Sequence, residues 1–208
     1  MLPGEFEYRR ATSVEEAVRL LAENEEAKLL AGGHSLLPMM KLHFAAPSML
    51  VDIGGIQELV FTKQDGDSLV VGSMTTHAHI ASSDTVGAEY GALAEAAASI
   101  GDVQVRNRGT IGGSLAHADP AADYGAATLA LDAQIELMGP NGQRSVDATN
   151  FFSGFLSTSM EPAELITVIR FPSTGNSVSV YEKFAQPASG FAIVGVAAKI
   201  TKQDNCCV

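Results

Sequence analysis

Two glycine-paired segments carry the clearest chemistry in this chain. Residues 31–35 read AGGHS and residues 110–114 read TIGGS, and each pair is expected where a strand-like apolar run stops. Glycine has no Cβ and reaches positive φ at little steric cost, so consecutive main-chain N–H groups can converge on one anion. Two such segments predict a ligand with two or more phosphates.

The residues around the pairs separate this prediction from an ordinary turn, which is the reading that fits a third pair, Gly54-Gly55. Thr110 and Ser114 flank the second pair with hydroxyls suited to phosphate oxygens. Asp123 would accept hydrogen bonds from ligand hydroxyls or, alternatively, be stabilised by a helix dipole. Neither a G-x-G-x-x-G fingerprint nor a G-x-x-x-x-G-K-[ST] loop occurs, so a Rossmann or Walker nucleotide site has no support.

Composition excludes several functional classes. The chain has 208 residues, 13 basic and 24 acidic side chains and a formal net charge of −11, which disfavours binding to nucleic acid or to an anionic membrane. No apolar run approaches the roughly 20 residues of a membrane span, and we expect a cytoplasmic protein. Cys206 and Cys207 cannot supply the four thiolates of an iron–sulfur site, and the spacing of His77 and His79 predicts no metal site.

Periodicity and capping signals predict alternating helices and strands. Predicted helices cover residues 14–23, a brief stretch within 34–41, 90–100 up to Gly101, and 121–131. Predicted strands cover residues 28–31, 50–53, 68–72, 134–138, 144–146, 165–171, 178–184 and 191–200, with a linker at 173–177.

A polar stretch, residues 102–120, is predicted as a long loop, and a loop of that length in a compact domain is usually functional or disordered. Asp119 is predicted to cap the helix that follows, with Pro120 in its first turn.

Residues 104–114 (QVRNRGTIGGS) and 116–123 (AHADPAAD), together with the first glycine segment, resemble the FAD-binding medium subunit of molybdenum hydroxylases. That family includes aerobic carbon monoxide dehydrogenase and the middle region of xanthine dehydrogenase. The resemblance covers almost the whole chain and implies an α+β fold: two α/β subdomains of the vanillyl-alcohol oxidase and murein reductase type, with FAD extended between them.

The implied organisation is an FAD-binding domain over residues 1–172, with subdomains at about 1–56 and 57–172. Residues 178–208 would begin a C-terminal α+β domain that continues for about another eighty residues in the family, so the resemblance implies a C-terminally truncated medium subunit.

The resemblance also implies a set of cofactor-binding residues. The two glycine loops would hold the pyrophosphate and neighbouring sugar groups, Gly101 would lie along the cofactor, and Asp123 would bind a cofactor hydroxyl. Tyr181 and Lys183 are counterparts of an aromatic residue and a lysine close to the flavin. His34 and His117 would either contact the cofactor or bond their own backbone. The implied residues are Leu29, Leu30, Ala31, Gly32, Gly33, His34, Ser35, Leu36, Gly101, Thr110, Ile111, Gly112, Gly113, Ser114, His117, Asp123, Tyr181 and Lys183.

In such enzymes a large subunit carries molybdopterin and a small one carries two [2Fe-2S] clusters. The resemblance therefore implies an FAD-dependent oxidoreductase subunit, active in a heterotrimer or a dimer of heterotrimers, that passes electrons from the clusters to an external acceptor without a catalytic acid or base of its own. Two alternatives stay open: a self-sufficient flavin oxidoreductase of the same fold, and a truncated assembly subunit without redox function.

Overall fold

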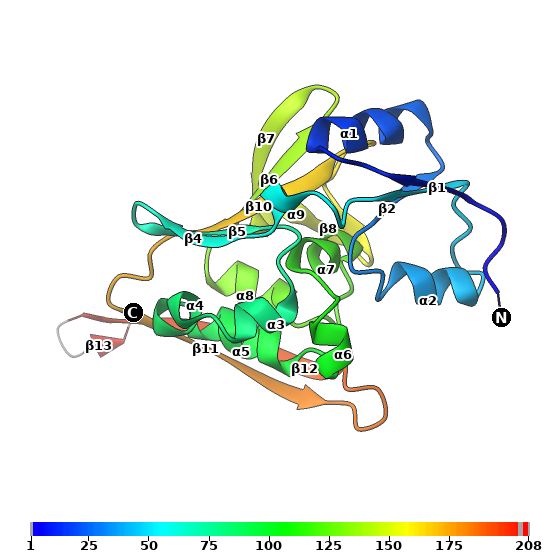
Figure 1. Ribbon diagram of the computed structural model, residues 1–208. Coiled ribbons are helices and arrows are strands. Elements are labelled where there is room, and N and C mark those ends of the chain that lie inside the picture. The colour runs from blue at the N-terminus through cyan, green and yellow to red at the C-terminus, as the bar shows by residue number, and fades with distance from the viewer. Residues whose placement is uncertain (1, 204–205, 208) are drawn as a thin grey trace.

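The chain folds as an α+β structure in which helices are layered between sheets (Figure 1). The computed structural model describes residues 2–203, 206 and 207. Within these residues, no helix has the length and apolarity that a bilayer crossing requires.

The first part of the chain forms a small parallel sheet in the order β1-β3-β2. Its elements are β1 (Glu7–Arg10), α1 (Val14–Glu23), β2 (Ala27–Leu30), α2 (Leu36–Lys41) and β3 (Met49–Asp52). The predicted helix over 14–23 is confirmed. It begins at Ser13, whose Oγ accepts the Glu16 N–H at 3.2 Å, and the Glu16 carboxylate accepts the Thr12 N–H at 2.7 Å.

A larger antiparallel sheet has the order β4-β5-β10-β6-β7. Its strands are β4 (Thr62–Asp65), β5 (Ser68–Gly72), β6 (Gln134–Gly139), β7 (Gly142–Asp147) and β10 (Leu165–Phe171). The helices that pack against it include α3 (His77–Ala81), α4 (Asp84–Glu89), α5 (Gly91–Ser99), α8 (Tyr124–Ala130) and α9 (Ala148–Phe151). Tyr90, Tyr124, Phe151 and Phe171 are its largest fully buried side chains. Shorter elements are η1 (Gln57–Leu59), β8 (Phe152–Gly154) and β9 (Ser157–Thr158).

The prediction of a long loop over residues 102–120 is wrong, because two short helices lie there: α6 (Val103–Arg106) and α7 (Ile111–His117). Asp102 Oδ1 caps the first by accepting the Val105 N–H at 2.8 Å, and Thr110 Oγ1 caps the second by accepting the Gly113 N–H at 3.2 Å. Each helix has only a few residues, so the polar and glycine content hid the apolar periodicity on which the sequence prediction relied.

The start of the next helix also differs from the prediction. α8 begins at Tyr124, and Asp119 instead accepts the Ala121 N–H at 2.9 Å in a turn that precedes the helix. Asp123 occupies the N-cap position but makes no capping hydrogen bond. The carboxylate of Asp123 is therefore free to bond elsewhere.

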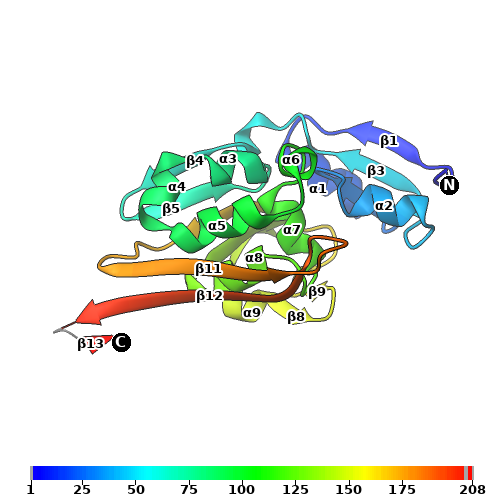
Figure 2. The same cartoon turned by 90° about the horizontal axis from the view of Figure 1, so that it is seen from below.

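The last part of the chain is a hairpin of β11 (Ser177–Ala185) and β12 (Ala192–Gln203), with β13 (Cys206–Cys207) paired to the end of β12. The hairpin lies along α5 and α8, on the side of those helices that faces away from the large sheet (Figure 2). Ser179 Oγ accepts the Ala92 N–H at 3.2 Å, and a Cβ at Gly91 would lie 2.6 Å from the Ser179 carbonyl oxygen. The two strands thus dock on the preceding body.

Candidate functional site

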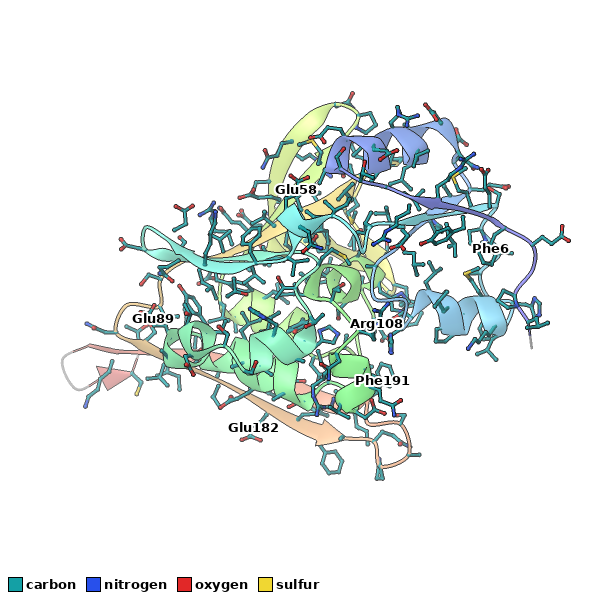
Figure 3. The ribbon with its side chains drawn as sticks, in the orientation of Figure 1. Phe6, Glu58, Glu89, Arg108, Glu182 and Phe191 are labelled. Atoms are coloured by element: carbon teal, nitrogen blue, oxygen red, sulfur yellow. The ribbon has the colours of Figure 1, made fainter. Side chains whose placement is uncertain are left out.

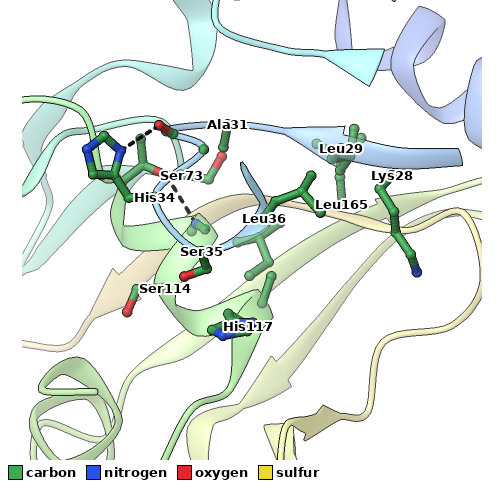
Figure 4. A pocket seen from close by; sticks show the side chains of 18 of the residues that line it. Lys28, Leu29, Ala31, His34, Ser35, Leu36, Ser73, Ser114, His117 and Leu165 are labelled. Atoms are coloured by element: carbon green, nitrogen blue, oxygen red, sulfur yellow. Dashed lines mark hydrogen bonds between the residues drawn. The ribbon is translucent and has the colours of Figure 1, made fainter. Parts of the chain in front are cut away.

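A cavity of about 1280 Å³ lies where the small sheet, the large sheet with its helices, and the hairpin meet. Ordinary ligand pockets measure about 300–1,000 Å³, so this one has room for a ligand of dinucleotide size. Figure 4 shows Ser35 and His34 from the loop after β2 on one side and Ser114 and His117 from α7 on the other.

The first glycine loop lines this cavity and has backbone N–H donors that are not used within the protein. The N–H groups of residues 32–36 make no hydrogen bond among the described residues, whereas the Leu37 N–H bonds the Gly33 carbonyl at 3.1 Å. Gly33 has φ +76°, a conformation that side chains with a Cβ rarely adopt. Successive unpaired N–H groups around a positive-φ glycine form an anion-binding concavity. The prediction of a backbone phosphate site therefore has geometric support at this loop.

The second glycine pair is built differently. It lies in the first turn of α7 and does not follow a strand, so the expected placement is wrong. All four N–H groups of residues 111–114 are already bonded. Their acceptors are the carbonyl oxygens of Thr75, Ser73 and Thr110 and the hydroxyl Oγ1 of Thr110.

Packing explains why glycine is required at Gly112, because a Cβ there would lie 2.6 Å from Ser73 Cβ. With its N–H groups occupied, this segment can offer a ligand only side-chain donors, such as the hydroxyl of Ser114.

Glycine also brings the two segments together. A Cβ at Gly32 would lie 2.3 Å from the Arg108 carbonyl oxygen and 2.8 Å from Gly109 Cα. A Cβ at Gly113 would lie 3.7 Å from Ala31 Cβ. The two segments, about eighty residues apart in sequence, therefore line one cavity, and any side chain at Gly32 would push them apart.

Asp123 forms a buried polar cluster with two side chains of the hairpin. Its carboxylate accepts the Tyr181 hydroxyl at 2.7 Å and lies 2.9 Å from Lys183 Nζ, which also donates to the Ser99 carbonyl at 3.0 Å. The Asp123 side chain is 6% exposed and that of Lys183 7%. Burial and the hydrogen bond to Asp123 raise the pKa of Tyr181 above its usual value, so its hydroxyl stays a donor.

Both readings of Asp123 stay predictions. Its oxygens bond the hairpin and not the N-terminus of α8. A carboxylate has about four acceptor positions, so Asp123, which also lines the cavity, keeps capacity for a ligand hydroxyl.

Fifteen of the predicted residues line the cavity: Leu29, Ala31, Gly32, Gly33, His34, Ser35, Leu36, Gly101, Thr110, Gly112, Gly113, Ser114, His117, Asp123 and Lys183. Leu30, Ile111 and Tyr181 do not. Ile111 is fully buried in the core and Tyr181 is 4% exposed, while Leu30 lies against a smaller pocket behind the loop. The Nδ1 of His34 bonds the Gly32 carbonyl at 2.9 Å, as the backbone reading expects, and its contact with the cofactor stays a prediction.

The lining residues that the sequence prediction missed include Ser73, His77 and Phe191. Phe191 precedes β12 at the tip of the hairpin (Figure 3), and its ring is 52% exposed. It is therefore the aromatic ring that the hairpin offers to the cavity, in place of Tyr181. In the sequence, an aromatic residue directly after a polar turn was the signal that could have indicated Phe191 as a site residue.

The comparison with known families agrees with this site. Residues 4–174 match the family described as the FAD-binding domain in molybdopterin dehydrogenase. The chain belongs to this family. FAD is accordingly its cofactor, and the chain is a subunit of an FAD-dependent oxidoreductase.

Relatives from this FAD-binding family are similar over more than nine tenths of the chain. The carbon monoxide dehydrogenase medium chain of Hydrogenophaga pseudoflava is 46% identical over 99% of this chain and 72% of its own length. A putative xanthine dehydrogenase FAD-binding subunit of Escherichia coli is 34% identical over 92% of this chain and 67% of its own length.

Solved structures of the same family confirm the predicted α+β fold. A carbon monoxide dehydrogenase of Hydrogenophaga pseudoflava that lacks the molybdenum-pyranopterin moiety superposes with a TM-score of 0.96 at 45% identity, covering all of this chain and 73% of the other. Quinoline 2-oxidoreductase of Pseudomonas putida 86 gives a TM-score of 0.94 at 34% identity, also over the whole chain and 73% of the other. The division into subdomains at about 1–56 and 57–172 stays a prediction.

Proposed function

We propose that this chain holds FAD in the cavity between its two glycine segments and passes electrons from the [2Fe-2S] clusters of a small partner subunit to an external acceptor. A large molybdopterin subunit would complete the heterotrimer. The arrangement as a dimer of heterotrimers and the cytoplasmic location belong to the same proposal. FAD, when bound, supplies the redox chemistry by taking up and releasing electrons.

The observation that carries the proposal is the set of N–H groups at residues 32–36 that bond no described residue. In a chain with a net charge of −11, a pyrophosphate needs donors that bring no neighbouring carboxylate, and backbone amides meet that need. The hydroxyls of Ser35, Thr110 and Ser114 line the same cavity and would add side-chain donors.

The hairpin would serve the other end of the cofactor. Lys183 brings a positive charge that Asp123 already compensates, and Phe191 brings an apolar ring face. A flat aromatic ring system can stack on the exposed face of Phe191. In this proposal the protein residues bind, orient and shield the flavin, and none of them acts as a catalytic acid or base.

Flavin retention by the purified chain tests the binding part. We expect a flavin absorption spectrum from the wild-type protein and a loss of at least about tenfold in FAD affinity for Gly33→Ala, because a Cβ there strains a backbone with φ +76° and lies 2.9 Å from Leu37 Cδ1. The matched control is Gly66→Ala, which imposes the same strain at φ +59° in the β4–β5 turn, far from the cavity lining. Equal affinities in both variants would refute the assignment of the first loop to the pyrophosphate.

Electron transfer is tested in the assembled complex. We expect reduction of the bound flavin by the complex's substrate when the iron–sulfur subunit is present and not when it is left out. Turnover of a small-molecule donor by this chain alone would instead favour the self-sufficient oxidoreductase. A complex that assembles and turns over without flavin would favour the assembly role.

A further inference from the structure

Two polar side chains behind the second glycine segment have no role in the proposal above. Ser73 follows β5 and is 3% exposed, and His77 begins α3 and is 4% exposed. Both line the cavity. Ser73 Oγ has no hydrogen-bond partner among the described residues, which is costly for a buried hydroxyl. Because this oxygen is also fully enclosed, His77 is the one of the two residues whose polar atom can meet a ligand.

The hydrogen bond of His77 fixes which of its ring nitrogens carries the proton. Nδ1 lies 3.1 Å from the hydroxyl oxygen of Tyr124, whose ring is fully buried. Within the described residues this hydroxyl has no other acceptor, so it donates to Nδ1. Burial lowers the pKa of His77 to about 4, with smaller effects from His34 and Arg106, so the ring is neutral at pH 7. A neutral imidazole that accepts at Nδ1 carries its hydrogen on Nε2.

The Nε2–H group of His77 lies beside the backbone of Gly109, and the His77 side chain lines the cavity. A Cβ built at Gly109 would lie 2.4 Å from Nε2, which places this nitrogen against the loop backbone. Nε2 bonds no described residue and is not one of the fully enclosed polar atoms that lack a partner, so it keeps some accessible surface. The Nε2–H group is therefore a hydrogen-bond donor that no described residue uses, in a side chain that lines the cavity.

The need for such a donor follows from the occupied backbone of α7. The N–H groups of residues 111–114 are all bonded within the protein, so ligand oxygens on this side of the cavity must be met by side chains. A neutral N–H donor suits an acceptor-only oxygen such as that of a phosphate, and it adds no proton-dependent charge near neutral pH.

We propose that the Nε2–H group of His77 hydrogen-bonds an oxygen of the FAD pyrophosphate. This inference rests on the proposed function, because it names residues of the same cavity. Tyr124 acts through His77: its hydroxyl holds the imidazole in the form that donates into the cavity.

Two amide substitutions distinguish a direct contact of His77 with FAD from a purely structural role of His77. In His77→Gln the side-chain amide nitrogen can reach the Nε2 position, while in His77→Asn the amide can replace Nδ1 but not Nε2. We expect FAD to bind His77→Asn about 10- to 100-fold more weakly than wild type, and His77→Gln to recover most of that loss. His79→Asn, on the exposed face of the same helix, is the matched control and should bind as wild type.

Two spectroscopic measurements use the folded protein directly. ¹⁵N-histidine NMR of the wild-type chain should show the His77 signal, assigned by its absence from His77→Gln, with Nε2 protonated and moving on FAD addition. ³¹P NMR should show a shift of a bound FAD phosphorus resonance between wild type and His77→Asn.

The outcomes distinguish this inference from the proposed function. If the wild-type chain binds no FAD, both fail. If it binds FAD while His77→Asn binds equally well, or while the His77 ¹⁵N signals do not respond to FAD, only this inference fails. A loss in His77→Gln with recovery in His77→Asn would assign His77 to the support of Tyr124 alone, and an unchanged ³¹P spectrum would overturn the pyrophosphate contact.

Discussion

Removal of the positive charge at Lys183 should destabilise the docking of the hairpin strongly. Lys183 and Asp123 are 2.9 Å apart with side chains 7% and 6% exposed, so Lys183→Met would leave a carboxylate buried without its counter-charge. Such a change typically costs about 3–5 kcal/mol. For a chain of this size, about 1 kcal/mol corresponds to a Tm change of about 2–4 °C, which predicts a fall of about 6–20 °C.

A double-mutant cycle isolates the pair. Asp123→Asn removes the negative charge but keeps an oxygen that can accept from the Tyr181 hydroxyl, so the combination of Asp123→Asn with Lys183→Met should cost clearly less than the sum of the two single changes. The assay is thermal and urea unfolding of the FAD-free chain, supported by hydrogen exchange at the β11 amides, which should accelerate first. Tyr181 is a useful probe because its N–H donates to Glu95 Oε2 at 2.7 Å.

The control for this cycle is Lys199→Met on the neighbouring strand. Lys199 pairs with Asp132, but the two side chains are 27% and 63% exposed, so loss of this pair should cost less than about 1 kcal/mol. If the two lysine variants lose similar stability, or if the Asp123 and Lys183 effects add within about 0.5 kcal/mol, the buried ion pair does not hold the hairpin to α8 and the reasoning is refuted.

Three further variants test other parts of the structure. Phe191→Ala should weaken FAD binding by about tenfold with an unchanged Tm of the FAD-free chain, because its ring is 52% exposed and lines the cavity; an unaltered FAD titration would argue against stacking. His77 has a folded pKa of about 4 against 6.5 when unfolded, so the unfolding free energy should fall by up to about 3 kcal/mol between pH 6.5 and 4, and urea melts of His77→Gln should lack that slope. Arg144→Met removes two bonds to Glu164, at 2.6 and 2.8 Å, and should cost about 1–3 kcal/mol in urea unfolding, with retained wild-type stability as the contrary result.

Elements with strong local signals could be predicted from the sequence. The capping box at Ser13 predicted α1, and the apolar run over 165–171 predicted β10, because each signal lies within the element itself. The two short helices between Asp102 and His117 depend on single capping side chains and on contacts with the segment after β5, and such tertiary support leaves little periodicity to detect.

The candidate site was predictable in its residues more than in their roles. The sequence predicts the same role, a backbone phosphate site, for Gly33 and Gly112. In the structure the N–H groups around Gly33 bond no described residue, whereas Gly112 allows close packing on Ser73. Alternation along β11 explains why Tyr181 is buried: it points inward with Ser179, and which face of a strand is covered depends on the helices beneath it.

Three parts of the structure meet at the cavity, and each contributes different groups that could bind a ligand. The segment after β2 supplies backbone donors that bond no described residue, the start of α3 supplies His77, and the hairpin supplies Lys183 and Phe191. Two contacts help to fix the relative positions of these parts: the close approach of Gly32 to Arg108, and the cluster of Asp123 with Tyr181 and Lys183. A ligand that touches all three parts binds only their assembled arrangement, so its binding free energy adds to the stability of that arrangement. The glycines and the buried ion pair thus affect cofactor affinity through the relative placement of the parts, even where they touch no ligand atom.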